Sequence, residues 1–186
     1  MPTGPARSKT VQDDSPDDAT LVAEAAGGND RAFALLYKRH ARYVAGVVYR
    51  LLGSDAELDD VVQETFCDAS AALAGLHDTS GLKAWLARIA VRRVYKRLAK
   101  RRRFRWLIGE AAHVAPKVSD PAVRERVDAL YEALDSLPPD LRIPWTLHMI
   151  EGETLPDVAA ICEVSLATAK RRIADADARI ERRGAR

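Results

Sequence analysis

One stretch of the sequence carries many positive charges and no negative charge. Residues 79–109 contain no Asp or Glu. The basic residues in and around this stretch are Lys83, Arg88, Arg92, Arg93, Lys96, Arg97, Lys100, Arg101, Arg102, Arg103 and Arg105. On a helix, Arg88, Arg92 and Lys96 share one face, where like charges repel. A bound polyanion would remove this repulsion, so the tract predicts contact with nucleic acid. The alternative is a solvated face, although such faces usually mix charges of both signs.

The beginning of this basic tract also holds an aromatic side chain and a polar loop. Trp85 could stack on an unpaired base, as aromatic side chains do in proteins that bind single strands. It also lies beside the apolar stripe of the helix, so a place in the core explains it equally well. The loop at residues 77–81 offers Thr79 and Ser80, whose small polar groups suit the edge of a base. The same residue types are typical of a loop that caps a helix.

A second basic cluster lies near the end of the chain, in a pattern typical of a helix-turn-helix. Thr154 can cap a short helix with Pro156 in its first turn. A brief turn follows at Glu163 and Val164, and Ser165 can cap the last helix. In this motif the second helix enters the major groove and its first residues face the bases. The residues expected there are Ser165, Thr168, Lys170, Arg171 and Arg172. A plain helical hairpin without DNA binding is the alternative.

The composition and the hydrophobic periodicity predict an all-α fold. The chain is rich in Ala, Leu, Val, Arg and Glu and poor in Gly and aromatic residues, which favours helix. The predicted helices span residues 30–52, 55–73, 82–103, 121–136 and 140–151, followed by the two helices of the helix-turn-helix. Pro144 interrupts one of these patterns, so we expect that helix to start nearer Ile143.

These helices divide into two small domains. The expected units are a disordered tail at 1–17, an N-terminal helical domain at 18–103, a flexible linker at 104–120 and a C-terminal helix-turn-helix domain at 121–186. Three amphipathic helices with short connections make the first unit a bundle. The linker region loses the helical periodicity and holds Gly109, Pro116 and Pro121.

The rest of the composition argues against several classes of protein. The net charge of +2 is small, so the charges matter through their distribution. The four histidines are scattered, and we expect no metal and no cofactor. Cys67 and Cys162 are expected to be buried reduced thiols, with one long-range disulfide as the alternative. No signal peptide and no membrane-spanning run is evident, so we expect no membrane insertion and a cytoplasmic protein.

Three stretches together resemble the extracytoplasmic-function (ECF) group of bacterial sigma factors. They are DDVVQETF at 59–66, WLARIA at 85–90 and EGETLPDVAAICEVSLATAKRR at 151–172. Their order and spacing match the family, and the likeness extends over most of the chain from about Ala19. It implies a two-domain protein that binds core RNA polymerase and promoter DNA to start transcription. It also implies regulation by an anti-sigma protein.

The resemblance assigns roles to individual residues. Asp60, Gln63 and Glu64 match the family's contacts to the largest polymerase subunit. The positions that match the reader of the minus-ten element are Thr79, Ser80, Lys83, Trp85, Arg88, Arg92, Arg93, Lys96 and Arg97. Those that match the reader of the minus-thirty-five element are the five residues of the last helix given above.

This chain departs from its relatives at several of these positions. Arg92 and Lys96 stand where Asn and Asp are frequent, so the minus-ten preference cannot be carried over. Glu163 stands where Gly is common; a left-handed backbone there would cost about 1–2 kcal/mol, unless the turn takes another shape. Asp175 and Asp177 stand where basic residues are frequent. We therefore expect the recognition helix to leave the DNA after two turns.

Two other classes of protein explain less of the sequence. A stand-alone helix-turn-helix regulator would bind operator DNA without polymerase, but it leaves DDVVQETF and the basic tract unexplained. An enzyme acting on nucleic acid would need a carboxylate or metal-ligand cluster. Asp59, Asp60 and Glu64 come nearest to one, and we expect no catalytic activity.

Overall fold

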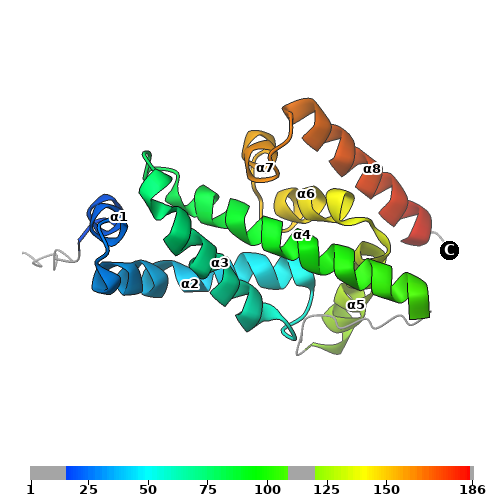
Figure 1. Ribbon diagram of the computed structural model, residues 1–186. Coiled ribbons are helices and arrows are strands. Elements are labelled where there is room, and N and C mark those ends of the chain that lie inside the picture. Colours follow the sequence, from blue (N-terminus) through cyan, green and yellow to red (C-terminus); the bar gives the residue numbers. More distant parts are fainter. Residues whose placement is uncertain (1–15, 109–119, 185–186) are drawn as a thin grey trace, which may run out of the picture.

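The computed structural model describes residues 16–108 and 120–184, and within them the chain is all helical. Figure 1 shows the arrangement. The helices are α1 (Asp18–Ala26), α2 (Asp30–Leu52), α3 (Leu58–Ala72), α4 (Leu82–Ile108), α5 (Pro121–Ser136), α6 (Pro139–Met149), α7 (Leu155–Ile161) and α8 (Leu166–Gly184), with a 3₁₀ turn η1 (Leu73–Gly75). The predicted all-α class with two domains is confirmed. The tail up to residue 15 and the linker residues 109–119 lie outside the described residues.

Local capping chemistry sets the ends of α2. The Asn29 side chain accepts hydrogen bonds from the backbone N–H groups of Arg31 and Ala32, so Asn29 caps the helix that begins at Asp30. Gly53 ends the helix in the left-handed conformation, with φ 74°. The next helix begins at Leu58 and not at residue 55 as expected. The reason is that Ser54 is buried and accepts a hydrogen bond from Arg101, so its hydroxyl caps no helix.

The long helix α4 lies at the centre of the molecule. It packs against α2 and α3 on one side and against α6 and α7 on the other (Figure 1). Its buried stripe includes Leu82, Leu86, Val94 and Leu98. The helix continues to Ile108, so the expected end at residue 103 was wrong. Arg and Leu favour helix, and the sequence has no Gly or Pro between residue 103 and Gly109.

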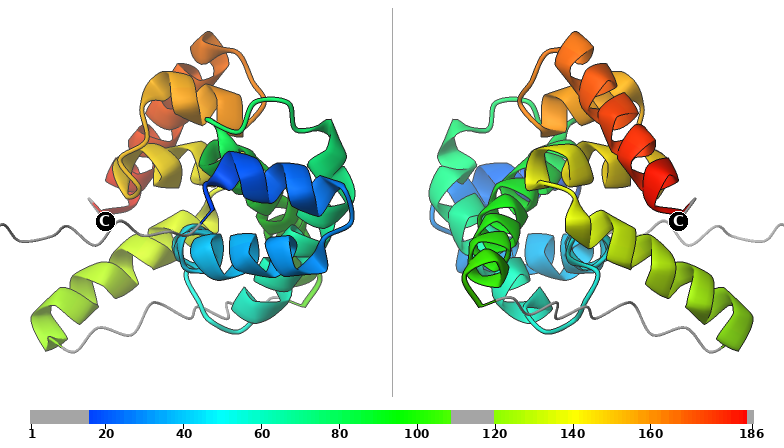
Figure 2. Two further views of the ribbon diagram at one scale, coloured as in Figure 1. Left: turned by 90° about the vertical axis from the view of Figure 1, so that its left-hand side faces the viewer. Right: turned by 90° about the vertical axis from the view of Figure 1, so that its right-hand side faces the viewer.

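The C-terminal helices form a second packed unit. The bounds of α5 match the prediction, and its N-terminal half projects away from the other helices with exposed side chains (Figure 2). The expected start of α6 near Ile143 was wrong, because Pro144 lies inside a helix that begins at Pro139. Residues 141–147 are all buried, and this packing outweighs the one backbone hydrogen bond that proline removes.

The two domains are in direct contact. The Arg50 guanidinium of α2 pairs with the carboxylate of Glu151, with a distance of 2.6 Å from Nη2 to Oε2. The Tyr131 hydroxyl donates to the backbone carbonyl of Arg50 over 3.2 Å. Arg142, which is 2% exposed, also reaches across the junction to the end of α2. The C-terminal domain therefore rests on α2 and α4 of the N-terminal domain.

Candidate nucleic-acid interface

A row of ion pairs joins the basic helix α4 to α3. The Arg93 Nε donates to Asp68 over 2.6 Å, and Arg97 Nη2 lies 2.5 Å from Glu64 Oε1. Arg101 pairs with Glu57, with 2.7 Å from Nε to Oε2, and the row continues along three turns of the helix. Hydrogen bonding to Arg93 lowers the pKa of the Asp68 carboxyl. Part of the positive charge of α4 is thus compensated within the domain.

These pairs show that the basic tract is not free of counter-charges. The tract 79–109 has no acidic residue of its own, but its counter-charges come from α3 at separations of 25 residues and more. Helical spacing within one segment could not reveal them. Basic residues without an ion pair among the described residues remain on α4, and these are the better candidates for phosphate contacts. They are Lys83, Arg88, Lys96, Lys100, Arg102 and Arg103.

The loop before α4 is held by local hydrogen bonds. The backbone N–H and the hydroxyl of Ser80 both donate to Asp78 Oδ1, over 2.9 and 2.6 Å, and this lowers the pKa of the Asp78 carboxyl. Thr79 is half-buried. Trp85 is partly exposed and packs against the core, so the structure is compatible with both roles considered for it. Lys83 Nζ lies 5.9 Å from the centre of the Tyr43 ring.

The turn of the helix-turn-helix sits on α4. The Arg92 guanidinium forms a two-pronged pair with Glu163, with 2.9 Å from Nε to Oε2. This pair lowers the pKa of the Glu163 carboxyl. Glu163 has φ 55°, so the turn adopts the left-handed backbone, and the other turn shape considered above is wrong. That conformation costs a residue other than glycine about 1–2 kcal/mol.

Both helices of the helix-turn-helix begin at the predicted caps. The Asp157 backbone N–H donates to Thr154 Oγ1, and the Thr168 backbone N–H donates to Ser165 Oγ. The Ser165 and Thr168 hydroxyls also bond each other over 2.9 Å, so their first role is to cap α8. Lys170 is exposed and free to reach a phosphate or a base.

The remaining basic residues of this motif differ in exposure. Arg171 is exposed, whereas Arg172 is half-buried. Asp177 accepts a hydrogen bond from the Trp145 indole N–H, a contact that no local sequence pattern indicates. This bond fastens α8 to α6 and gives Asp177 a structural role at the point where we expect α8 to leave the DNA.

Helix α3 presents a polar face of its own. Asp60 and Gln63 are exposed, whereas Val62 and Phe66 are buried. Glu64, which was expected on the same polymerase-binding face, points instead to α4 and pairs with Arg97. Two further exposed side chains on this part of the surface were not predicted, Tyr37 and Cys67. The Tyr37 ring packs edge to face with Phe66, with 4.6 Å between the ring centroids. Cys67 was expected to be buried, and that was wrong.

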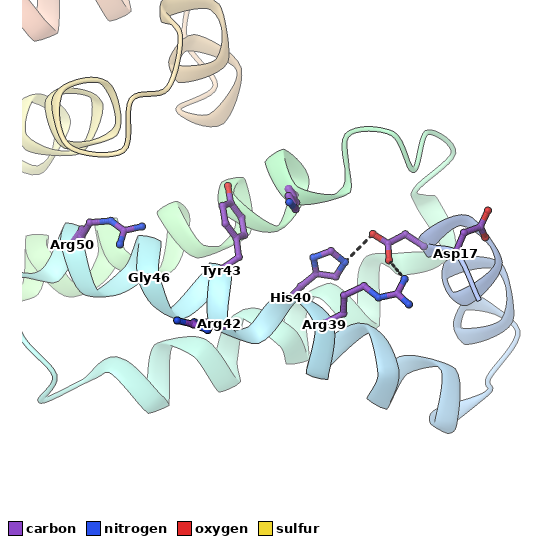
Figure 3. Close-up of a pocket in the computed structure, with 9 residues that line it drawn as sticks. Asp17, Arg39, His40, Arg42, Tyr43, Gly46 and Arg50 are labelled. Carbon is purple, nitrogen blue, oxygen red and sulfur yellow. Dashed lines mark hydrogen bonds and ion pairs between the residues drawn. The ribbon is translucent and has the colours of Figure 1, made fainter. Parts of the chain in front are cut away.

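A cleft of about 980 Å³ opens beside α2 and is lined by residues of the N-terminal domain. Figure 3 shows Arg39 and His40 bonded to one carboxylate, which belongs to Asp18 of α1. Arg42, Tyr43 and Lys83 also line it. Burial, with Glu153 and Glu151 nearby, raises the pKa of Tyr43 to about 12. Of these residues the sequence singled out only Lys83, because no local motif marks His40 or Tyr43.

Among the described residues no group of His, Cys, Asp or Glu is arranged to hold a metal ion. No helix of this part of the chain is long and apolar enough to cross a membrane.

The fold and these surfaces define a class: an all-helical protein in which one domain carries a basic central helix and the other a helix-turn-helix. Family models match both parts. Residues 36–104 match sigma-70 region 2, and residues 128–179 match sigma-70 region 4. The ECF RNA polymerase sigma-E factor of Escherichia coli is 30% identical over 169 residues, which cover 84% of this chain and 88% of the relative. The RNA polymerase sigma-H factor of Pseudomonas aeruginosa is 28% identical over 171 residues, with the same coverage.

Solved structures agree with these matches. CnrH in complex with the cytosolic domain of CnrY has a TM-score of 0.61 at 29% identity, over 88% of this chain and 94% of that one. For the sigma factor RpoE of Bartonella quintana, solved with the anti-sigma factor NepR, the TM-score is 0.62 at 24% identity, over 81% of this chain and 95% of that one. The chain belongs to the ECF family of RNA polymerase sigma factors, as the resemblance implied.

Proposed function

We propose that this sigma factor binds core RNA polymerase through the exposed face of α3. Asp60 and Gln63 lie on that face and match the family's polymerase contacts. Glu64 contributes through its pair with Arg97, which holds α3 against α4. The observation that carries the proposal is the presence of both sigma-70 regions, in order, on one chain.

The chain would read DNA with two separate surfaces. Lys83, Trp85 and the uncompensated basic residues of α4 would hold the opened strand of the minus-ten element, beside the loop at Thr79 and Ser80. Lys170, Arg171 and Arg172 would contact the minus-thirty-five element from α8. Each surface alone would bind weakly, and polymerase would fix the distance between them, so both contacts form only in the complex.

The proposed activity is promoter recognition without catalysis by this chain, and the proposed site of action is the cytoplasm. We also propose an anti-sigma partner. The cleft beside α2 offers an open surface on the N-terminal domain, and both solved relatives described above are complexes with a second protein. An anti-sigma protein would compete with core polymerase, so adding core should displace it from the chain.

The test is co-purification of the full chain with core polymerase, followed by sequencing of the bound DNA. The account predicts a stoichiometric complex and one enriched promoter motif. Asp60→Ala and Gln63→Ala should weaken the complex, whereas Glu125→Ala, an exposed change on α5, should not. Tight binding to operator DNA without polymerase would instead favour the stand-alone regulator.

A further inference from the structure

The turn of the helix-turn-helix covers part of the DNA-binding face of α4. Helix α7 packs against α4. The carboxylate of Glu163, which follows α7, accepts hydrogen bonds from Nε and Nη2 of Arg92. Arg92 is 59% exposed and Glu163 45% exposed, so the pair lies at the surface. A carboxylate in this two-pronged geometry presents two oxygens to arginine much as a DNA phosphate does.

Glu163 adopts a backbone conformation that is unfavourable for residues other than glycine. Its φ of 55° is the backbone conformation that favours glycine. A non-glycine residue in such a conformation at a functional surface suggests a role for its side chain. The only ion-pair partner of that side chain among the described residues is Arg92.

Arg88, one turn before Arg92, adds an independent observation. Its Nε is buried and has no hydrogen-bond partner in the described part of the chain. A buried donor without an acceptor is unfavourable. This donor is unsatisfied in the structure, and a phosphate bound on α4 would supply an acceptor.

We propose that Glu163 acts as an internal phosphate mimic, which occupies the DNA site of Arg92 while the protein is free. DNA and Glu163 then compete for Arg92, and the C-terminal domain must move away before the opened strand can lie along α4. The second pair, Arg50 with Glu151, holds the same domain from the α2 side. The inference rests on the proposed function in one respect, which is that Arg92 contacts DNA.

Two substitutions remove the mimic in different ways. Glu163→Gly removes the side chain and suits the left-handed backbone, so the variant should fold at least as well as the wild type. Glu163→Gln keeps the shape and removes the charge. The matched control is Glu125→Gln, which makes the same charge change at an exposed position of the same domain that has no ion pair.

The measurement is fluorescence anisotropy of a labelled oligo-dT of about 12 nucleotides, titrated with each full-length protein at low salt. Both Glu163 variants should bind about two- to fivefold more tightly than the wild type, as expected for loss of an exposed pair. The control should stay near the wild type. Small-angle scattering without DNA should show a larger radius of gyration for Glu163→Gly.

Three results would overturn the proposal: unchanged affinity in both variants, an equal gain in the control, or tighter binding with no change in shape. None of these depends on polymerase. A chain that gave no promoter-dependent transcript but showed the predicted gain would refute the proposed function and leave this competition intact.

Discussion

The Nε of Arg142 in α6 donates a hydrogen bond to the backbone carbonyl of Leu51 in α2, over 3.0 Å. Leu51 lies in the last turn of α2, where carbonyl groups have no partner within the helix. An arginine of one domain thus caps a helix of the other. Burial lowers the pKa of Arg142, and its pair with Asp135 opposes this shift. At this point the domain junction is therefore held by a buried hydrogen bond.

Replacing Arg142 should strongly destabilise the protein. Arg142→Met keeps an unbranched apolar stem but removes the hydrogen bond to Leu51 and the charge beside Asp135. We expect the free energy of unfolding to fall by about 3–5 kcal/mol, measured by urea denaturation. Arg124→Ala, which breaks an exposed pair within α5, should change it by less than about 1 kcal/mol. Equal stability of the two variants would contradict this account of the junction.

Gly53 is required for two separate reasons. Its φ is 74°, and a Cβ placed on it would lie 2.5 Å from Cδ1 of Tyr131 in the other domain. Gly28 also has a positive φ, of 92°, but a Cβ there would meet nothing within 4 Å. Both Gly→Ala changes should cost about 1–2 kcal/mol for the backbone. Gly53→Ala should lose about 1–3 kcal/mol more through the clash, and thermal unfolding of the two variants would reveal the difference.

The basic residues of α4 should separate into two groups. Lys96 is exposed and has no ion pair among the described residues, so Lys96→Gln should weaken binding to single-stranded DNA and reduce the salt slope by about 0.7. Arg97 pairs with Glu64 and Glu57, so Arg97→Gln should leave that slope nearly unchanged. It should instead lower the free energy of unfolding by about 0.5–1 kcal/mol. Equal slopes for the two variants would show that the pairs with α3 open when DNA binds.

The two cysteines should react at different rates. Both are free thiols, but Cys67 is exposed, whereas burial raises the pKa of Cys162 to about 11. Because the thiolate is the reactive form, iodoacetamide near neutral pH should modify Cys67 first and Cys162 only on unfolding. Mass spectrometry of the native protein should find a single rapid adduct. Two adducts forming at one rate would place Cys162 in a more open environment.

Acid should weaken the protein through its surface carboxylates. The pKa values of Asp68 and Glu163 are lowered from 3.8 and 4.5 by hydrogen bonds from arginine. Their stabilisation is therefore present at neutral pH and is lost as the pH falls through the lowered values. Glu153, whose pKa burial raises, acts in the opposite direction. The urea concentration at the unfolding midpoint should decrease as the pH is lowered below about 4. The Asp68→Asn variant should show a smaller decrease. A midpoint that rises on acidification would contradict the pairing.

The sequence predicted what depends on neighbouring residues. The caps at Thr154 and Ser165 follow from side chains that bond the backbone three residues away. The end of α2 at Gly53 follows from one residue's backbone freedom. These signals, with the helical periodicity, were enough for the all-α class and the helix-turn-helix.

What the sequence could not predict depends on contacts between distant segments. The pairs of Arg92 with Glu163 and of Arg97 with Glu64 join residues 71 and 33 positions apart, and no local pattern marks them. The sequence alone indicates that α4 is a basic helix without counter-charges. In the structure these pairs neutralise part of its charge. Pro144 is a further example, because the burial of α6 in the tertiary structure outweighs the local preference of proline to end a helix.

The central claim is that this sigma factor directs core polymerase to promoters through α3, α4 and α8. The most direct test is run-off transcription with purified core polymerase on the promoters recovered by co-purification. We predict a transcript with a defined start that requires this chain, falls sharply with Lys170→Ala plus Arg171→Ala, and survives Glu125→Ala. Core polymerase that gives no promoter-dependent transcript with the wild-type chain, across the recovered set, would contradict the account.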